Sequence, residues 1–180
     1  MVTARAQSRP APSLYTPEQR QRRDSTAWTT VQGVLAPLQF VVFLVSLGLV
    51  LRYLATGGGY ELATASVVVK TLVLYVIMIT GAIWERVVFG QYLFAPAFFW
   101  EDVVSMLVLA LHTAYLAAVF TGVGTPAQEM WIALAAYAAY VINAAQFVWK
   151  LRMARLQSAA TNQATRHPSH ATSPLAEVSA

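Results

Sequence analysis

The chain contains no cysteine and few charged residues. Only 11% of its 180 residues are Asp, Glu, Lys or Arg, whereas 57% are hydrophobic. The missing cysteines exclude disulfides, thiolate metal sites and thiol catalysis. A soluble domain is about 25% charged, so the scarcity of charge indicates a membrane protein.

Several functional motifs are absent as well. The sequence has no HExxH, no Walker loop, no dinucleotide fingerprint and no GxSxG. These absences argue against redox-cofactor enzymes and nucleotide-driven pumps. The net charge of +4 comes from basic residues near the two ends of the chain. That distribution fits membrane orientation better than a nucleic-acid-binding face, so we expect no nucleic-acid partner.

Long apolar runs dominate the middle of the chain. Crossing the hydrocarbon takes roughly 20 residues in a helix, and four runs are long enough. We therefore predict an all-α integral membrane protein with four transmembrane helices, at about 30–54, 62–88, 97–120 and 128–149. A polar, basic tail at 1–26 precedes the membrane domain at 27–156, and a disordered tail is expected at 157–180.

Basic residues flank both ends of the membrane domain. Five arginines precede the first span, and Lys150, Arg152 and Arg155 follow the last. The positive-inside bias then places both termini in the cytoplasm. In the N-terminal tail, Thr16 and Gln19 have the spacing of a capping box, so a short helix should begin at Pro17.

The stretch 83–102 brings carboxylates and aromatic residues together where two apolar runs meet. Glu85 ends one run, and Glu101 and Asp102 begin the next. Carboxylates at membrane depth are costly unless they are paired, hydrated or protonated. They could be structural, with Glu85 paired to Arg86 or Lys150 and the other two favoured by the helix dipole. Alternatively, Glu85 and Glu101 could face each other and perform proton chemistry, because a carboxyl in an apolar pocket has a raised pKa.

Other polar residues lie inside the spans. His112 could be a core histidine, a proton relay or an axial ligand to a metallated macrocycle. Lys70 is expected to extend its ammonium back to the nearer interface as an anchor. Gln32, Asn143 and Gln146 are most simply interhelical hydrogen-bonding groups. The aromatic turn could be an interfacial belt or a surface for a flat conjugated ligand.

Five long strings in the chain resemble the vinyl bacteriochlorophyllide hydratase family. They are TTVQGVLAPLQF at 29–40, TGAIWE at 80–85, FGQYLFAPAFFWED at 89–102, LHTAY at 111–115 and, after Asn143, QFVWKLR at 146–152. Together they extend the resemblance over about residues 14–156.

The resemblance implies an enzyme of bacteriochlorophyll synthesis, a carbon–oxygen hydro-lyase. Such an enzyme adds water across the C3 vinyl group of a chlorophyllide and gives a 1-hydroxyethyl group. It implies no cofactor, because the magnesium belongs to the tetrapyrrole substrate. It also implies a multi-pass protein of the bacterial inner, photosynthetic membrane, with water, the lipid bilayer and other enzymes of the pathway as partners.

That reaction needs an acid, a group that positions water and a platform for a flat ring. The candidate catalytic residues are Glu85, Glu101 and Asp102. The candidate substrate-binding residues are His112, Trp84, Arg86, Phe89, Tyr92, Phe98, Phe99, Trp100, Gln32, Asn143 and Gln146. In this set His112 would bind the substrate magnesium, and Arg86 or Lys150 would hold the propionate carboxylate.

Two other classes of function use the same residues differently. A non-catalytic pigment-binding or assembly protein would need the aromatic residues and His112 but not the carboxylates. A proton or small-ion transporter would need a continuous polar path through Lys70, His112 and Glu101. The absence of an obvious inverted repeat in the sequence weakens the transporter interpretation.

Overall fold

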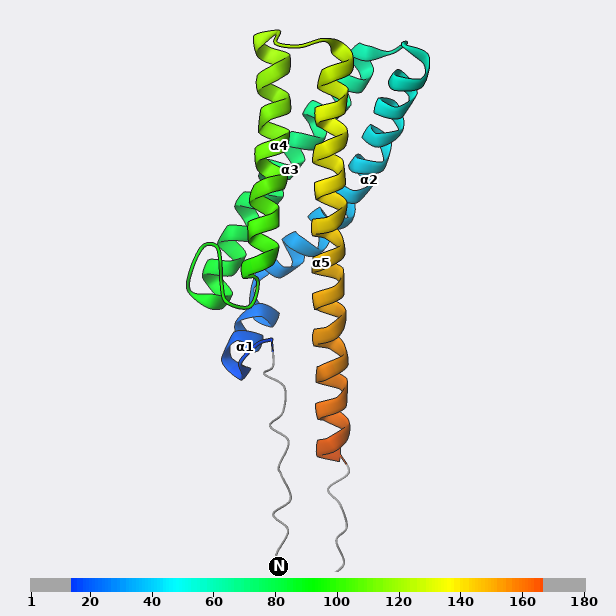
Figure 1. Ribbon diagram of the computed structural model, residues 1–180. Helices are drawn as coiled ribbons and strands as arrows, with labels where there is room; N and C mark the ends of the chain where they lie inside the picture. The colour runs from blue at the N-terminus through cyan, green and yellow to red at the C-terminus, as the bar shows by residue number, and fades with distance from the viewer. Residues whose placement is uncertain (1–13, 167–180) are drawn as a thin grey trace, which may run out of the picture.

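The computed structural model describes residues 14–166, and the regular structure in that range is entirely helical (Figure 1). The helices are α1 (Pro17–Ser25), α2 (Ala27–Thr56), α3 (Tyr60–Phe89), α4 (Phe99–Thr121) and α5 (Pro126–Arg166). Four of them, α2 to α5, are long and apolar enough to cross a membrane. The predicted all-α membrane fold is therefore confirmed.

The long helices form two hairpins. α2 packs mainly on α3, and α4 packs mainly on α5, with fewer contacts between the hairpins. Gly57 and Gly59 have positive φ angles of 70° and 86° in the α2–α3 turn, a conformation that glycine adopts without strain. Figure 1 shows both hairpin turns at one end of the bundle, which we call the turn end. α1 and the α3–α4 connection lie at the opposite end, the α1 end.

Aromatic and small side chains fill the bundle interior. Phe43 of α2 packs against two tyrosines of α5, Tyr137 at a ring-centroid distance of 5.4 Å and Tyr140 at 4.9 Å. Ala133 and Ala136 of α5 are completely buried, which allows close approach of the neighbouring helices. Large apolar side chains such as Ile79 remain exposed on the outside, as expected of a surface that faces lipid.

The helix at the N-terminal end agrees with the prediction, whereas the helix at the C-terminal end is longer than predicted. The predicted helix at Pro17 is present, and Thr16 and Gln19 form the expected capping box. α5 continues to Arg166, so residues 157–166 are helical where a disordered tail was predicted. Alanine, glutamine and arginine are frequent after 149, and all three favour helix. The rest of the two predicted tails, at 1–13 and 167–180, lies outside the described residues.

Candidate functional site

Two of the three candidate carboxylates hold the α3–α4 connection in place. Asp102 Oδ2 accepts a hydrogen bond from the backbone N–H of Phe94 at 2.7 Å, and Glu85 Oε2 accepts one from Ala95 N–H at 3.3 Å. Phe94 has a φ of 61°, a strained value for a residue other than glycine. The Glu85 and Asp102 carboxyls are also close enough to interact with each other, and both side chains are buried. Two such carboxyls can hydrogen-bond to each other only when one of them holds a proton.

The third carboxylate points elsewhere. Glu101 Oε2 lies 2.5 Å from Lys150 Nζ, in an ion pair that joins α4 to α5. Asn143 Nδ2 donates to the backbone carbonyl of Glu101 at 2.9 Å and to Ser105 Oγ at 3.0 Å. The expected facing pair of Glu85 and Glu101 is thus replaced by Glu85 with Asp102. The reason is that consecutive helical residues project about 100° apart, so Glu101 and Asp102 cannot both face α3.

Five aromatic rings form a cluster beside these carboxylates. Phe98 is at its centre, with ring-centroid distances of 5.7 Å to Trp84, 5.8 Å to Phe89 and 5.9 Å to Phe147. Lys150 Nζ lies 5.0 Å from the Phe98 ring centroid, so the ion pair borders the cluster. The rings of this aromatic cluster are Tyr15, Trp84, Phe89, Phe98 and Phe147.

Sequence reasoning identified three of these rings and missed Tyr15 and Phe147. Tyr15 stacks on Phe89 with a centroid distance of 5.7 Å and an interplanar angle of 19°. Burial raises the pKa of the Tyr15 phenol, against the opposing effect of the nearby Arg23. The ring therefore stays uncharged at neutral pH. No local pattern pointed to Tyr15, which lies in a polar tail far from Phe89 in the sequence.

A pocket of about 270 Å³ opens next to the cluster. Its polar lining residues are Glu101, Lys150 and Gln157, so the ion pair of Glu101 with Lys150 borders a space for a ligand. We call it the Glu101 pocket. Its lining residues are Leu14, Glu101, Trp149, Lys150, Met153, Ala154 and Gln157.

The structure separates the remaining candidate aromatics from the cluster. Tyr92, Phe99 and Trp100 are exposed on the surface, with 61%, 43% and 69% of their area accessible. They fit the alternative of an interfacial belt. Arg86 donates a hydrogen bond to the carbonyl of Gly90 and lies over the Tyr92 ring, so it stabilises the end of α3.

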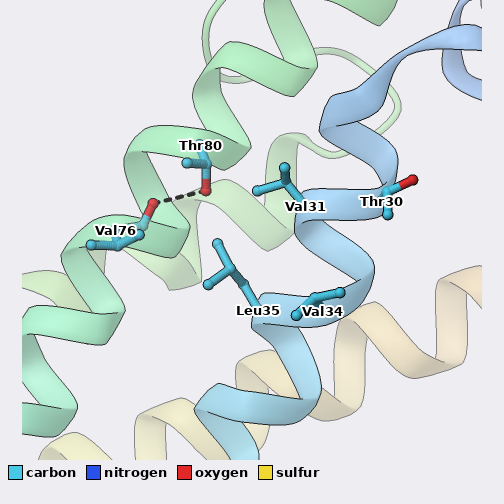
Figure 2. Close-up of a pocket in the computed structure, with 6 residues that line it drawn as sticks. All are labelled: Thr30, Val31, Val34, Leu35, Val76 and Thr80. Carbon is cyan, nitrogen blue, oxygen red and sulfur yellow. Dashed lines mark hydrogen bonds between the residues drawn. The ribbon is translucent and has the colours of Figure 1, made fainter.

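A second depression lies between α2 and α3, and its lining is almost wholly apolar (Figure 2). Gln32 Nε2 donates to Thr80 Oγ1 at 2.8 Å beside it, which places this candidate residue in a helix–helix contact. The depression is open to the outside and contains no ionisable group, so it suits a lipid chain better than acid–base chemistry. Its lining residues are Thr30, Val31, Val34, Leu35, Val76 and Thr80.

Lys70 and His112 meet in the interior of the bundle. Lys70 Nζ lies 2.8 Å from His112 Nε2, and neither residue has any exposed surface. The expectation that Lys70 reaches back to the interface is therefore wrong, because its partner lies on α4. His112 Nδ1 donates to the carbonyl of Val108 at 2.8 Å, so both ring nitrogens are engaged within the protein. In this arrangement His112 has no nitrogen free for a substrate magnesium.

The last candidate, Gln146, has a buried side-chain oxygen with no hydrogen-bond partner. Among residues 14–166, no group of three or more His, Asp or Glu side chains is placed to hold a metal ion.

Comparison with known proteins decides the family. The family model described as 2-vinyl bacteriochlorophyllide hydratase matches residues 15–153. The chain belongs to the 2-vinyl bacteriochlorophyllide hydratase family. Two proteins that carry the name 2-vinyl bacteriochlorophyllide hydratase are similar to it. The one from Cereibacter sphaeroides is 73% identical over 143 residues, which are 79% of this chain and 89% of the relative. The one from Rhodobacter capsulatus is 67% identical over 153 residues, 85% of this chain and 89% of the relative.

No solved structure matches this family member. The hydratase family match covers all three candidate carboxylates and the whole aromatic cluster. It begins at Tyr15, so that ring lies inside the matched region.

Proposed function

We propose that the protein hydrates the vinyl group of a chlorophyllide, at C3 of the macrocycle, to a 1-hydroxyethyl group during bacteriochlorophyll synthesis. Family membership supports this activity. The structural observation that carries it is the position of Glu101, a buried carboxylate that lines a pocket beside the aromatic cluster. The protein would work in the inner membrane of a phototrophic bacterium.

The chemistry divides into two proton transfers and one bond to oxygen. A proton adds to the terminal vinyl carbon and leaves a cation on the inner carbon, delocalised into the macrocycle. Water then attacks the inner carbon, and the resulting oxonium loses a proton. The sum is the addition of one water, with no oxidant or reductant. Aromatic faces beside the developing cation stabilise it through their quadrupoles.

The two carboxylate arrangements suit the two proton transfers. Glu101 forms an ion pair with Lys150 at the pocket, a position from which its carboxylate would orient water and accept its proton. Glu85 and Asp102 are buried next to each other, an arrangement in which two carboxyls can share one proton, so this pair would be the store from which the vinyl carbon is protonated. General acid–base assistance of this kind contributes about 10²–10⁴-fold to a rate.

The activity is tested in membranes from a non-photosynthetic host that are supplied with chlorophyllide a. We expect a blue shift of the red-most absorption band and a product heavier by one water. In water labelled with heavy oxygen, the label should enter the hydroxyl group, and in deuterated water one deuterium should enter the new methyl group. Bound pigment of unchanged mass would contradict the hydratase assignment and favour the pigment-carrier alternative.

A further inference from the structure

The Glu101 pocket is too small for the substrate of the proposed reaction. Its volume is about 270 Å³, whereas pockets that enclose drug-sized ligands have volumes of about 300–1,000 Å³, and a tetrapyrrole is among the larger of such ligands. The ring would be enclosed there only if part of the wall moved. Six of the seven lining residues belong to the membrane helices α4 and α5, and only Leu14 comes from the N-terminal segment.

The residue after Leu14 fills the aromatic cluster. Tyr15 is only 4% exposed and lies almost parallel to Phe89, with Phe98 on another side at a centroid distance of 6.4 Å. Offset, near-parallel stacking is also how a flat conjugated macrocycle packs on a phenyl ring. Tyr15 therefore occupies a position in which one edge of the substrate ring could stack, next to the pocket that contains Glu101.

The segment that carries Tyr15 lies on the surface of the bundle. None of the residues of α1 itself is buried. Its hydrogen bonds to the membrane helices include one of 3.4 Å from Arg22 Nη1 to the Val88 carbonyl of α3 and one of 2.6 Å from Thr29 Oγ1 of α2 to the Arg23 carbonyl. Arg23 lies 4.7 Å from the Tyr15 ring centroid and belongs to the same segment, so it would move with the ring.

The connection between α1 and α2 is a single residue. Thr26 is the C-cap of α1 and the N-cap of α2, with an extended backbone at φ −86° and ψ 138°. A change in the dihedral angles of this one residue would swing α1 as a unit, with loss of the hydrogen bond from Thr29 Oγ1 to the Arg23 carbonyl, and leave the membrane helices in place. Short connections of this type serve as hinges in many enzymes.

We propose that the substrate macrocycle binds against Phe89 and Phe98 in the place that Tyr15 occupies here, and that residues 14–25 are the lid that lifts at Thr26 to admit it. This inference rests on the proposed function. It gives α1 a role in substrate entry and makes Tyr15 a residue that the substrate displaces.

A reversible crosslink tests the lid directly, because the chain has no cysteine of its own. Leu14→Cys and Met153→Cys would place thiols on the lid and on α5, in two residues that line the same pocket. A bifunctional thiol reagent with a reducible bridge then ties the lid to the bundle. Binding is measured with a chlorophyllide analogue that has an ethyl group in place of the vinyl group and so cannot be hydrated.

We expect the crosslinked protein to bind this analogue at least about tenfold more weakly, because the apparent dissociation constant rises as the open fraction falls. Reduction of the bridge should restore binding. A monofunctional thiol reagent of similar size modifies both cysteines without tying the lid, and should leave most of the binding intact. If the analogue binds with the same dissociation constant before and after the crosslink is cleaved, the lid proposal is wrong.

The displacement of Tyr15 has a test of its own. Tyr15→Ala removes the ring that competes with the substrate, so the apparent dissociation constant should fall severalfold. Tyr15→Phe keeps the ring and should resemble the original chain. Tyr53→Ala is the matched control, because Tyr53 packs on Tyr60 at 5.6 Å at the turn end and should leave binding unchanged. If folded Tyr15→Ala protein binds the analogue more weakly than the original chain, the proposal that the substrate displaces Tyr15 is wrong.

Hydration of chlorophyllide a, measured in parallel, separates the two proposals. If the crosslinked protein binds the analogue and hydrates chlorophyllide a normally, the lid proposal is wrong and the hydratase proposal stands. If the uncrosslinked protein binds the pigment without hydrating it, the proposed activity is wrong while the lid can still be judged from the analogue. If it binds neither compound, both proposals are wrong.

Discussion

Lys70 Nζ lies 2.8 Å from Nε2 of His112, and both side chains are completely buried between α3, α4 and α5. Two tyrosine rings of α5 complete the surroundings of the ammonium group, at 5.2 Å for Tyr137 and 4.3 Å for Tyr140. Because Lys70 lies in one helical hairpin and His112 in the other, the hydrogen bond joins the two halves of the bundle. We predict that its role in this arrangement is structural.

A double-mutant cycle measures that role. His112→Leu leaves the Lys70 amine buried without an acceptor and should lower the free energy of unfolding by about 1–3 kcal/mol, or more if the amine is charged. Lys70→Met should cost less, because it leaves only a neutral ring nitrogen unpaired. The double variant should be more stable than His112→Leu alone. Thermal unfolding of the purified proteins in detergent gives the comparison.

The same variants also test magnesium ligation. If His112 is structural, His112→Leu membranes assayed well below the melting temperature should keep hydration activity within about threefold, since a loss of stability alone does not change the transition state. A loss of pigment binding in folded His112→Leu protein would show instead that the imidazole leaves Lys70 and ligates the substrate.

The ion pair between Glu101 and Lys150 should be essential for hydration. Glu101→Gln keeps the size and a carbonyl oxygen but loses the proton acceptor, so the hydration rate should fall by about 10²–10⁴-fold. Pigment binding should remain. Trp100→Phe is a suitable control, because it changes the neighbouring but exposed residue. The measurement is product mass per unit of membrane protein, and unchanged activity in Glu101→Gln would exclude this residue as the base.

The buried pair of Glu85 and Asp102 combines a structural and a chemical role, and matched variants separate them. Asp102→Ala frees the N–H of Phe94 and should destabilise the protein by about 1–3 kcal/mol. Asp102→Asn keeps an oxygen acceptor for that N–H, so it should retain the fold and lose most of the hydration activity. Glu85→Gln should behave like Asp102→Asn.

If the two carboxyls share one proton, the double variant Glu85→Gln with Asp102→Asn should be no less active than either single variant, because residues that act as a unit are non-additive. Losses of activity that multiply in the double variant would contradict a shared proton. Comparing melting temperatures across the set shows whether any loss comes from unfolding.

Composition and local spacing predicted the helices well for physical reasons. A run of apolar residues long enough to cross the hydrocarbon has few alternatives to a helix. The helix that begins at Pro17 was equally predictable, because its cap uses residues three apart, Thr16 and Gln19. The predicted concentration of carboxylates and aromatic rings at one end of the bundle followed from the meeting of two spans at 83–102.

Partner choice within the site was not predictable in the same way. Glu85 meets Asp102 because the connection turns through Phe94 at a positive φ angle and directs two backbone N–H groups at these carboxyls. Nothing in the identity of a phenylalanine signals that conformation. Tyr15 and Phe147 join the aromatic cluster through tertiary packing alone, and Lys70 finds a partner in a helix 42 residues away. Periodicity describes faces of one helix and carries no information on which faces meet.

The orientation of the bundle stays a prediction and can be tested with single cysteines in this cysteine-free chain. Gln19→Cys in α1 and Gln91→Cys in the α3–α4 connection lie at the α1 end, and Gly58→Cys lies in the turn between α2 and α3. The positive-inside bias predicts that the first two thiols face the cytoplasm and the third faces the opposite side. In intact cells, a membrane-impermeant maleimide should therefore label only Gly58→Cys. After permeabilisation it should label all three. Labelling of Gln19→Cys in intact cells would reverse the orientation and place the Glu101 pocket at the outer face.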